Sequence, residues 1–197
     1  YVAGPLTGKL FADFGAEVIV VENEAYLRNH QSSRQPGFGS TDNTSLNQGN
    51  MFNRYGTNKL SLSLDLKNPQ ALELIKRLVA VSDIVMDNFR PHVTEKWGLA
   101  YNDLVKVKPD IIVLNMPTMG KGSIYEEHRA ESWNLLAMSG FNYMSGREGT
   151  IPVCPSVFSH PDVSCNPYHA MIALLSALSC RERTGKGAHI ELSQFES

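Results

Sequence analysis

Short apolar runs and longer amphipathic stretches alternate along this chain. Apolar runs bounded by polar residues occur at 17–22, 83–89, 111–116 and 188–192, and such runs are typical of strands that are covered on both faces. Residues 60–66 (LSLSLDL) instead alternate with a period of two, which predicts a strand with one polar face. The sequence therefore predicts strands spread over its whole length.

Helical spacing of apolar residues lies between these predicted strands. It predicts helices over 6–14, 70–81, 101–107 and 133–139, a short one over 94–97, and a long one that ends at Gly185. Residues 23–53 are rich in Gly, Ser, Asn and Gln, so we expect a long loop there. Alternating strands and helices predict an α/β fold with a Rossmann-like, mostly parallel sheet and helices on both faces.

The segment 159–187 (SHPDVSCNPYHAMIALLSALSCRERTGKG) places one acid before the longest predicted helix. Asn166 is a suitable N-cap, Pro167 suits the first helical position, and Gly185 and Gly187 are suited to stop the helix. Asp162 precedes that helix in a short polar loop. By pattern it is either a catalytic carboxylate or a turn former, and the pattern alone favours the turn former.

Composition and charge narrow the class of protein. The 197 residues are 42% hydrophobic and 19% charged, which predicts one compact domain over 1–197. A net charge of -2 gives no sign of nucleic-acid binding. No apolar stretch approaches the roughly 20 residues of a membrane span. An odd number of cysteines without metal-type spacing, Cys154, Cys165 and Cys180, predicts a reducing, cytoplasmic location and no metal site.

Cations follow the predicted strands, where open α/β sheets bind ligands. The basic residues assigned to these segments are Arg28, Lys59, Lys67, Arg90, Lys96 and Lys121. Phe89 and Trp97 lie among them, and cations beside aromatic rings suit a nucleotide-like ligand. A solvated rim of basic residues is the alternative. The Gly-rich dinucleotide and P-loop motifs are both absent from the sequence.

Ordered blocks of the sequence resemble the family III CoA-transferases, which include the formyl-CoA and carnitine CoA-transferases. The blocks are AGPLTGKLFADFGAEVIVVE, NRYGTNKLSLSLDLK, DNFRPHVTEKWGL and RERTGKGAHIELSQFE. The resemblance implies a CoA-binding, Rossmann-like large domain, a smaller domain, and two subunits interlocked as a homodimer or as a heterodimer with a related subunit. Members are about twice as long, so we expect this chain to be an N-terminal half without the first strand.

The resemblance also implies roles for individual residues. Asp162 matches the catalytic acid, which carries first the acyl group as an anhydride and then CoA as a thioester, although an alignment without gaps places Val163 there. Glu131 or Ser132 stands where formyl-CoA transferases have an assisting Glu, and Val2 replaces a Gln near their catalytic site. We therefore expect a different acceptor pocket. The residues implied to bind coenzyme A are Arg28, Lys67, Asn88, Phe89, Lys96, Trp97 and Arg129.

Two other functions remain open on the sequence. One is a 2-methylacyl-CoA racemase on the same fold, which would need a His beside the acid, and the nearby candidates are His128, His160 and His169. The other is a non-catalytic subunit that binds CoA or supports an active partner.

Overall fold

The computed structural model describes residues 2–23, 49–152 and 160–197. Arg28 and Cys154 lie outside these ranges. The chain forms two compact units, Tyr1–Glu73 and Leu74–Ser197.

The first unit is built around a parallel strand pair. Its elements are α1 (Ala3–Asp13), β1 (Ile19–Glu22), α4 (Asn50–Tyr55) and β2 (Leu60–Ser63). Strands β1 and β2 pair in parallel, with Ile19 opposite Leu60. Helix α5 (Pro69–Val81) leads from this unit into the second. The Asn68 side-chain oxygen accepts the Gln70 N–H at 2.9 Å and so caps the start of this helix.

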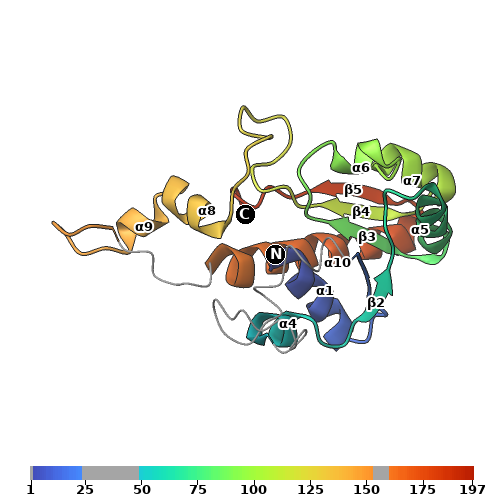
Figure 1. Cartoon of the computed structure of the whole chain (residues 1–197), viewed down its shortest axis with the longest axis horizontal. Helices are drawn as coiled ribbons and strands as arrows, with labels where there is room; N and C mark the ends of the chain where they lie inside the picture. Colours follow the sequence, from blue (N-terminus) through green and yellow to red (C-terminus); the bar gives the residue numbers. More distant parts are fainter. Residues whose placement is uncertain (1, 24–48, 153–159) are drawn as a thin grey trace. The chain divides into compact units, whose positions relative to one another are not determined.

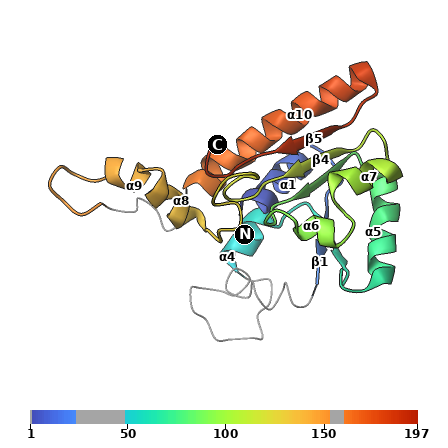
Figure 2. The same cartoon turned by 90° about the horizontal axis from the view of Figure 1, so that it is seen from above.

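The second unit contains a three-stranded parallel sheet in the order β3-β4-β5. The strands are β3 (Ile84–Asp87), β4 (Ile112–Asn115) and β5 (Ala188–Glu191). Helices α6 (Val93–Lys96) and α7 (Tyr101–Val107) lie on one face, and the long α10 (Asn166–Thr184) lies on the other (Figure 1). The view from above shows α10 running beside β5 (Figure 2). This confirms the predicted α/β fold, with every described strand pair parallel.

The core of the second unit lies around β4. Ile112 and Leu114 are completely buried, because β4 is the central strand and has a helix layer on each face. On α10, Ala170 and Leu174 are also buried, and this helix contacts both β4 and β5. At the far end of α10, the Arg181 guanidinium donates to Asp83 Oδ1 at 2.7 Å. The helix is thus fixed both by apolar packing and by a charged hydrogen bond.

Three short helices differ from the expectation. Helix α4 occupies part of the stretch predicted to be a loop, and α9 (Phe141–Met144) follows α8 (Ser132–Met138). Residues 161–165, predicted as a polar loop, form the π-helix η1 (Pro161–Cys165), which continues directly into α10. No helix in the described ranges is both long enough and apolar enough to span a bilayer.

The two glycines that were predicted to stop α10 have different roles. Gly185 ends the helix in the left-handed conformation at φ 69°, as predicted. Gly187 instead allows a close approach of two backbones, because a Cβ at this position would lie 2.2 Å from the Ile111 carbonyl oxygen. The Ala188 N–H donates to that same oxygen at 3.2 Å. A side chain here would therefore push β5 away from β4.

We predict that Gly187→Ala lowers the free energy of unfolding by about 1–3 kcal/mol, the usual cost of overpacking. Chemical denaturation of the two proteins measures this difference. Gly146→Ala is the matched control, since its Cβ would meet no described atom closer than 3.5 Å. Equal losses in the two variants would contradict this account of Gly187.

Candidate functional site

The carboxyl ends of the three parallel strands carry a connected set of polar side chains. The strand register places Asp87, Asn115 and Glu191 side by side. The Asn115 amide donates to Asp87 Oδ2 at 2.6 Å, and Asn115 Oδ1 lies 2.7 Å from His189 Nε2. Because that amide oxygen can only accept, His189 carries its proton on Nε2. Tyr101 stacks on the His189 ring with centroids 4.8 Å apart.

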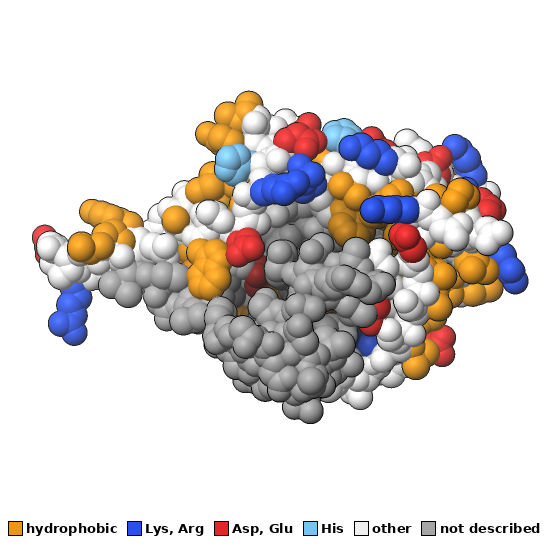
Figure 3. Space-filling view, viewed as in Figure 1, with side chains coloured by type: hydrophobic (Ala, Val, Ile, Leu, Met, Phe, Trp, Pro, Cys, Tyr) orange, Lys and Arg blue, Asp and Glu red, His pale blue; other side chains and the backbone are white. Residues whose placement is uncertain are grey.

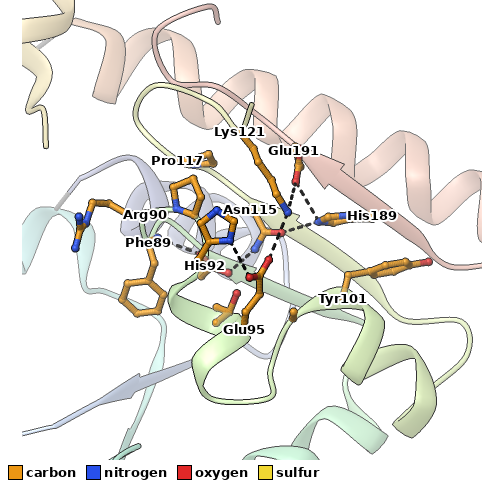
Figure 4. Close-up of a pocket in the computed structure, with 14 residues that line it drawn as sticks. Phe89, Arg90, His92, Glu95, Tyr101, Asn115, Pro117, Lys121, His189 and Glu191 are labelled. Atoms are coloured by element: carbon orange, nitrogen blue, oxygen red, sulfur yellow. Dashed lines mark hydrogen bonds and ion pairs between the residues drawn. The ribbon is translucent and has the colours of Figure 1, made fainter. Parts of the chain in front are cut away.

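Burial makes Asp87 an unusually weak acid. Desolvation raises its pKa to about 6, although the hydrogen bonds from the Phe89 N–H and the Asn115 amide act in the opposite direction. Asp87 thus titrates near neutral pH, and it is one of the residues that line the pocket shown in Figure 4.

Basic and acidic side chains form ion pairs at the rim of this pocket. The Lys121 ammonium lies 3.5 Å from Glu95 and 4.0 Å from Glu191, and these side chains converge in Figure 4. Arg90 pairs with Glu127 at 3.3 Å. Lys and Arg side chains accordingly lie beside Asp and Glu side chains on the face shown in Figure 3. The rim is a mixed-charge surface, and its cations are partly neutralised.

The two aromatic residues implied to bind CoA come together beside this pocket. The Phe89 and Trp97 rings meet edge to face, with centroids 5.5 Å apart. Phe89 is 42% exposed, which leaves ring surface open for a planar ligand. Asn88 follows β3 directly, and Lys96 is exposed at the end of α6. The structure therefore gathers these four residues in one region.

The other residues assigned to CoA binding are placed differently. Arg129 is exposed in the loop ahead of α8, while Lys67 belongs to the first unit, and Arg28 lies outside the described residues. The assignment of Lys59 to a strand's carboxyl end is wrong, because it precedes β2 and donates to the Pro5 carbonyl at 2.8 Å. Burial lowers the pKa of Lys59 to about 8.

One group of side chains in the described residues could hold a metal ion. Ligand atoms of His92, Glu126 and Glu127 lie within 4.8 Å of one another. Each of them also has a protein partner: Glu95 contacts His92 at 2.8 Å, the Gly122 N–H donates to Glu126 at 2.6 Å, and Arg90 pairs with Glu127. A metal would have to displace these contacts.

Asp162 and Ser132 form the second polar centre. Asp162 lies in η1, and the Ser132 hydroxyl at the start of α8 donates to Asp162 Oδ2. Ser132 is only 7% exposed, so this hydrogen bond is shielded from water. The side chain that faces Ser132 is therefore that of Asp162 and not that of Val163.

Glu131 caps the neighbouring helix. Its backbone N–H donates to the Asn134 side chain at 2.9 Å, and its carboxylate accepts from Trp133 Nε1 at 2.9 Å. The structure therefore pairs Ser132, and not Glu131, with Asp162. The negative charge of Glu131 still contributes to raising the Asp162 pKa.

Burial is the main reason that the pKa of Asp162 lies above its ordinary value. The hydrogen bond from Ser132 and the nearby Asn166 side chain lower it in part. A desolvated carboxylate is a stronger nucleophile and base than an exposed one. The arrangement suits Asp162 for chemistry rather than for a turn.

Asn166 does not cap α10, contrary to the prediction. Its side chain is completely buried, and its Oδ1 accepts the Ser197 hydroxyl. Pro167 does lie in the first turn of the helix, as predicted. The sequence predicted a cap at Asn166 because Asn-Pro before an apolar run is the usual signal of a helix start. The π-helix η1 precedes α10 without a break, so the chain is already helical at Asn166 and no cap is formed there.

Two of the three candidate histidines contact other aromatic rings, and the third is exposed. His128 meets Tyr125, with ring centroids 6.2 Å apart, and His160 packs against Phe141. His169 is exposed on α10. Within the described ranges, none of the three forms a hydrogen bond or ion pair with Asp162.

Comparison with known proteins gives one family. The family described as CoA-transferase family III matches residues 1–197. The beta subunit of a succinyl-CoA–L-malate CoA-transferase from Chloroflexus aurantiacus is 31% identical over 196 residues, which are 100% of this chain and 46% of that protein. A succinate–glutarate CoA-transferase from Agrobacterium fabrum is 30% identical over 99% of the chain and 48% of its own length.

Solved structures also resemble this chain over nearly its whole length. A CAIB/BAIF family protein from Brucella suis superimposes with a TM-score of 0.87 at 29% identity, covering 99% of this chain and 50% of that one. The chain spans about half the length of the curated relatives it matches. From the whole-chain family match and the shared fold, this chain belongs to CoA-transferase family III.

Proposed function

We propose that the protein represented by this chain is an acyl-CoA:carboxylate CoA-transferase, with Asp162 as the nucleophile. The observation that carries the proposal is the partly buried Asp162 carboxylate, held by the neutral Ser132 hydroxyl rather than neutralised by a described cation. Relatives that are named CoA-transferases support the same reaction class.

In this reaction the CoA thioester is a substrate. One oxygen of Asp162 attacks the acyl carbon, the carbon–sulfur bond breaks, and the products are a mixed anhydride on Asp162 and CoA thiolate. The thiolate then attacks Cγ of Asp162, and the donor acid leaves with the bridging oxygen. An acceptor carboxylate reverses these steps. Covalent catalysis of this kind divides one difficult exchange into easier steps.

Phe89 and Trp97 are the groups best suited to hold the adenine end of CoA. Their edge-to-face contact fixes the two rings, and bases stack well on exposed aromatic faces. Lys96 and Arg90 are adjacent to these two residues in the sequence and supply positive charge for phosphates. Asn88, Lys67, Arg129 and Arg28 complete the set that we assign to CoA.

The substrates that we propose are dicarboxylic acids and their CoA thioesters. Relatives named for succinyl-CoA with malate, and for succinate with glutarate, support this class. Some of these relatives are named as alpha and beta subunits, which supports an assembly of two related or identical subunits. We place the protein in the cytoplasm.

A racemase is the weaker alternative. A mouse α-methylacyl-CoA racemase is 30% identical over 98% of the chain, but proton exchange needs a base beside the acid. The contacts of His128 and His160 with other rings favour transfer over racemisation.

We expect Asp162→Asn to reduce CoA transfer from succinyl-CoA by at least about 1,000-fold, because the amide cannot form the anhydride. The steady-state rate with a dicarboxylate acceptor measures the loss, and calorimetry should show unchanged CoA binding. Asp103→Asn, at an exposed pair with Lys106 on α7, is the control. Transfer by Asp162→Asn at the wild-type rate would exclude Asp162 as the nucleophile.

The transfer rate should fall as the pH drops through a pKa higher than that of an ordinary Asp, since protonated Asp162 cannot attack. Ser132→Ala removes a hydrogen bond that lowers this pKa, so the acidic limb of its pH–rate profile should move to higher pH. Rates measured from pH 4 to 8 with a saturating donor test this. An unchanged or lower midpoint in the variant would contradict the role of Ser132.

Phe89→Ala should weaken CoA binding roughly tenfold, because loss of one base–aromatic stack costs about 1–3 kcal/mol. Calorimetric titration with CoA measures the change. Tyr143→Ala removes an aromatic ring that is 80% exposed on α9 and serves as the control. Equal affinities for Phe89→Ala and the wild type would place adenine elsewhere.

If the racemase assignment were correct, 2-methylacyl-CoA incubated with the protein in heavy water would gain deuterium at its α-carbon. We expect no deuterium above the level without protein. Mass spectrometry of the recovered thioester provides the measurement.

A further inference from the structure

Asn166 holds a buried hydrogen-bond donor that the fold itself does not use. Its side chain is 0% exposed, and Nδ2 has no hydrogen-bond partner among the described residues. Unpaired buried donors are rare in folded proteins, since water can no longer satisfy them. Such a group calls for a functional explanation.

The other end of the same amide is anchored. The Ser197 hydroxyl donates to Asn166 Oδ1, which fixes the side chain so that the amide nitrogen points away from Ser197. Asn166 is also the first residue of α10, and α10 is held by its packing on β4 and β5. The donor is therefore preorganised rather than free to rotate.

The donor lies next to the proposed nucleophile. Asp162 precedes Asn166 by four residues in the continuous helical run of η1 and α10, and side chains at this spacing are neighbours on a helix surface. The Asn166 side chain lies near enough to Asp162 to lower the pKa of that carboxyl group, although no complete hydrogen bond joins Nδ2 to a described residue. The spacing along the helix and the anchored Oδ1 leave the amide nitrogen on the side of Asp162.

We propose that Asn166 is a catalytic residue whose Nδ2–H stabilises the oxyanion that forms on Asp162 itself. This inference rests on the proposed function. When CoA thiolate attacks Cγ of Asp162 in the anhydride, a carbon–sulfur bond forms and the carbonyl electron pair moves onto the remaining Asp162 oxygen. That oxygen then regains its double bond, the bond from Cγ to the bridging oxygen breaks, and the donor acid leaves as a carboxylate.

Asn166 loses and gains no proton in this step. Its amide makes its strongest hydrogen bond while the oxygen bears the full negative charge, which is how a fixed donor lowers a barrier. Ser132 already donates to Oδ2 of the resting carboxylate. The two donors, on α8 and α10, would share the oxygens of Asp162.

Asn166→Leu in the full-length protein tests the proposal, because Leu has a similar size and no donor. We expect kcat for succinyl-CoA transfer to fall about 100- to 1,000-fold, as for loss of one oxyanion donor. Asn102→Leu, at an exposed position on α7, is the matched control and should keep the wild-type rate. A kcat within about threefold of wild type in a folded Asn166→Leu protein would overturn the proposal.

Rapid acid quenching followed by mass spectrometry separates a catalytic role from a structural one. The wild-type Asp162 peptide should carry mainly CoA, whereas Asn166→Leu should accumulate the acyl adduct, since only the second step needs the oxyanion donor. We expect the ratio of acyl to CoA adduct to rise at least about tenfold. An unchanged ratio would assign Asn166 a structural role and overturn the proposal.

Asn166→Asp serves if the Leu variant does not fold. It keeps the size of Asn and an acceptor for Ser197 but loses the donor at neutral pH, so the same rise in the adduct ratio is expected. The proposed function fails separately, because it predicts an adduct on Asp162 in the wild type. No wild-type adduct would reject the nucleophile, whereas wild-type adducts with unaltered kinetics in both variants would reject only the role of Asn166.

Discussion

Packing of α10 on the central strand β4 fixes the position of the groups around Asp162. Ala170 and Leu174 are almost wholly buried, and the helix contacts β4 and β5 along the sheet. Because η1 continues into α10 without a break, anchoring the helix also anchors Asp162 and Asn166. The Arg181–Asp83 hydrogen bond holds the opposite end.

The parallel register of the sheet determines a second set of positions. Asp87, Asn115 and Glu191 end three neighbouring strands at the same level, which brings their side chains into one hydrogen-bonded pocket. Asp87 is kept partly protonated near neutral pH by burial. The pocket and the Phe89–Trp97 pair lie on the strand-end loops, where open α/β sheets bind ligands.

Burial near Asp162 has opposite effects on stability and chemistry. A desolvated carboxylate and an unpaired amide donor both destabilise the folded protein. In the mechanism that we propose, the same two features favour attack by Asp162 and stabilise the charge that develops on it. Such costs are typical of functional sites, where the rest of the fold compensates for them.

The sequence by itself determined the α/β class and the approximate position of most elements. Apolar runs of strand length and amphipathic periodicity are local properties, so helices such as α5 and α7 could be predicted within a residue or so. The resemblance to the family implied Asp162 as the catalytic acid, which remains a prediction. Strand ends could also have indicated Asp87 and Asn115, since the residues that close parallel strands meet at one edge.

Only the tertiary structure decided which side chains meet. Ser132 lies thirty positions from Asp162, and no local pattern distinguishes it from Glu131 as the partner. Local signals assigned Asn166 to a helix cap and Gly187 to a helix stop. The π-helical turn and the close approach to Ile111 gave them other roles. The physical reason is that a hydrogen bond or a backbone contact between distant segments depends on how helices and strands pack. That packing is not determined by the residues next to one position in the sequence.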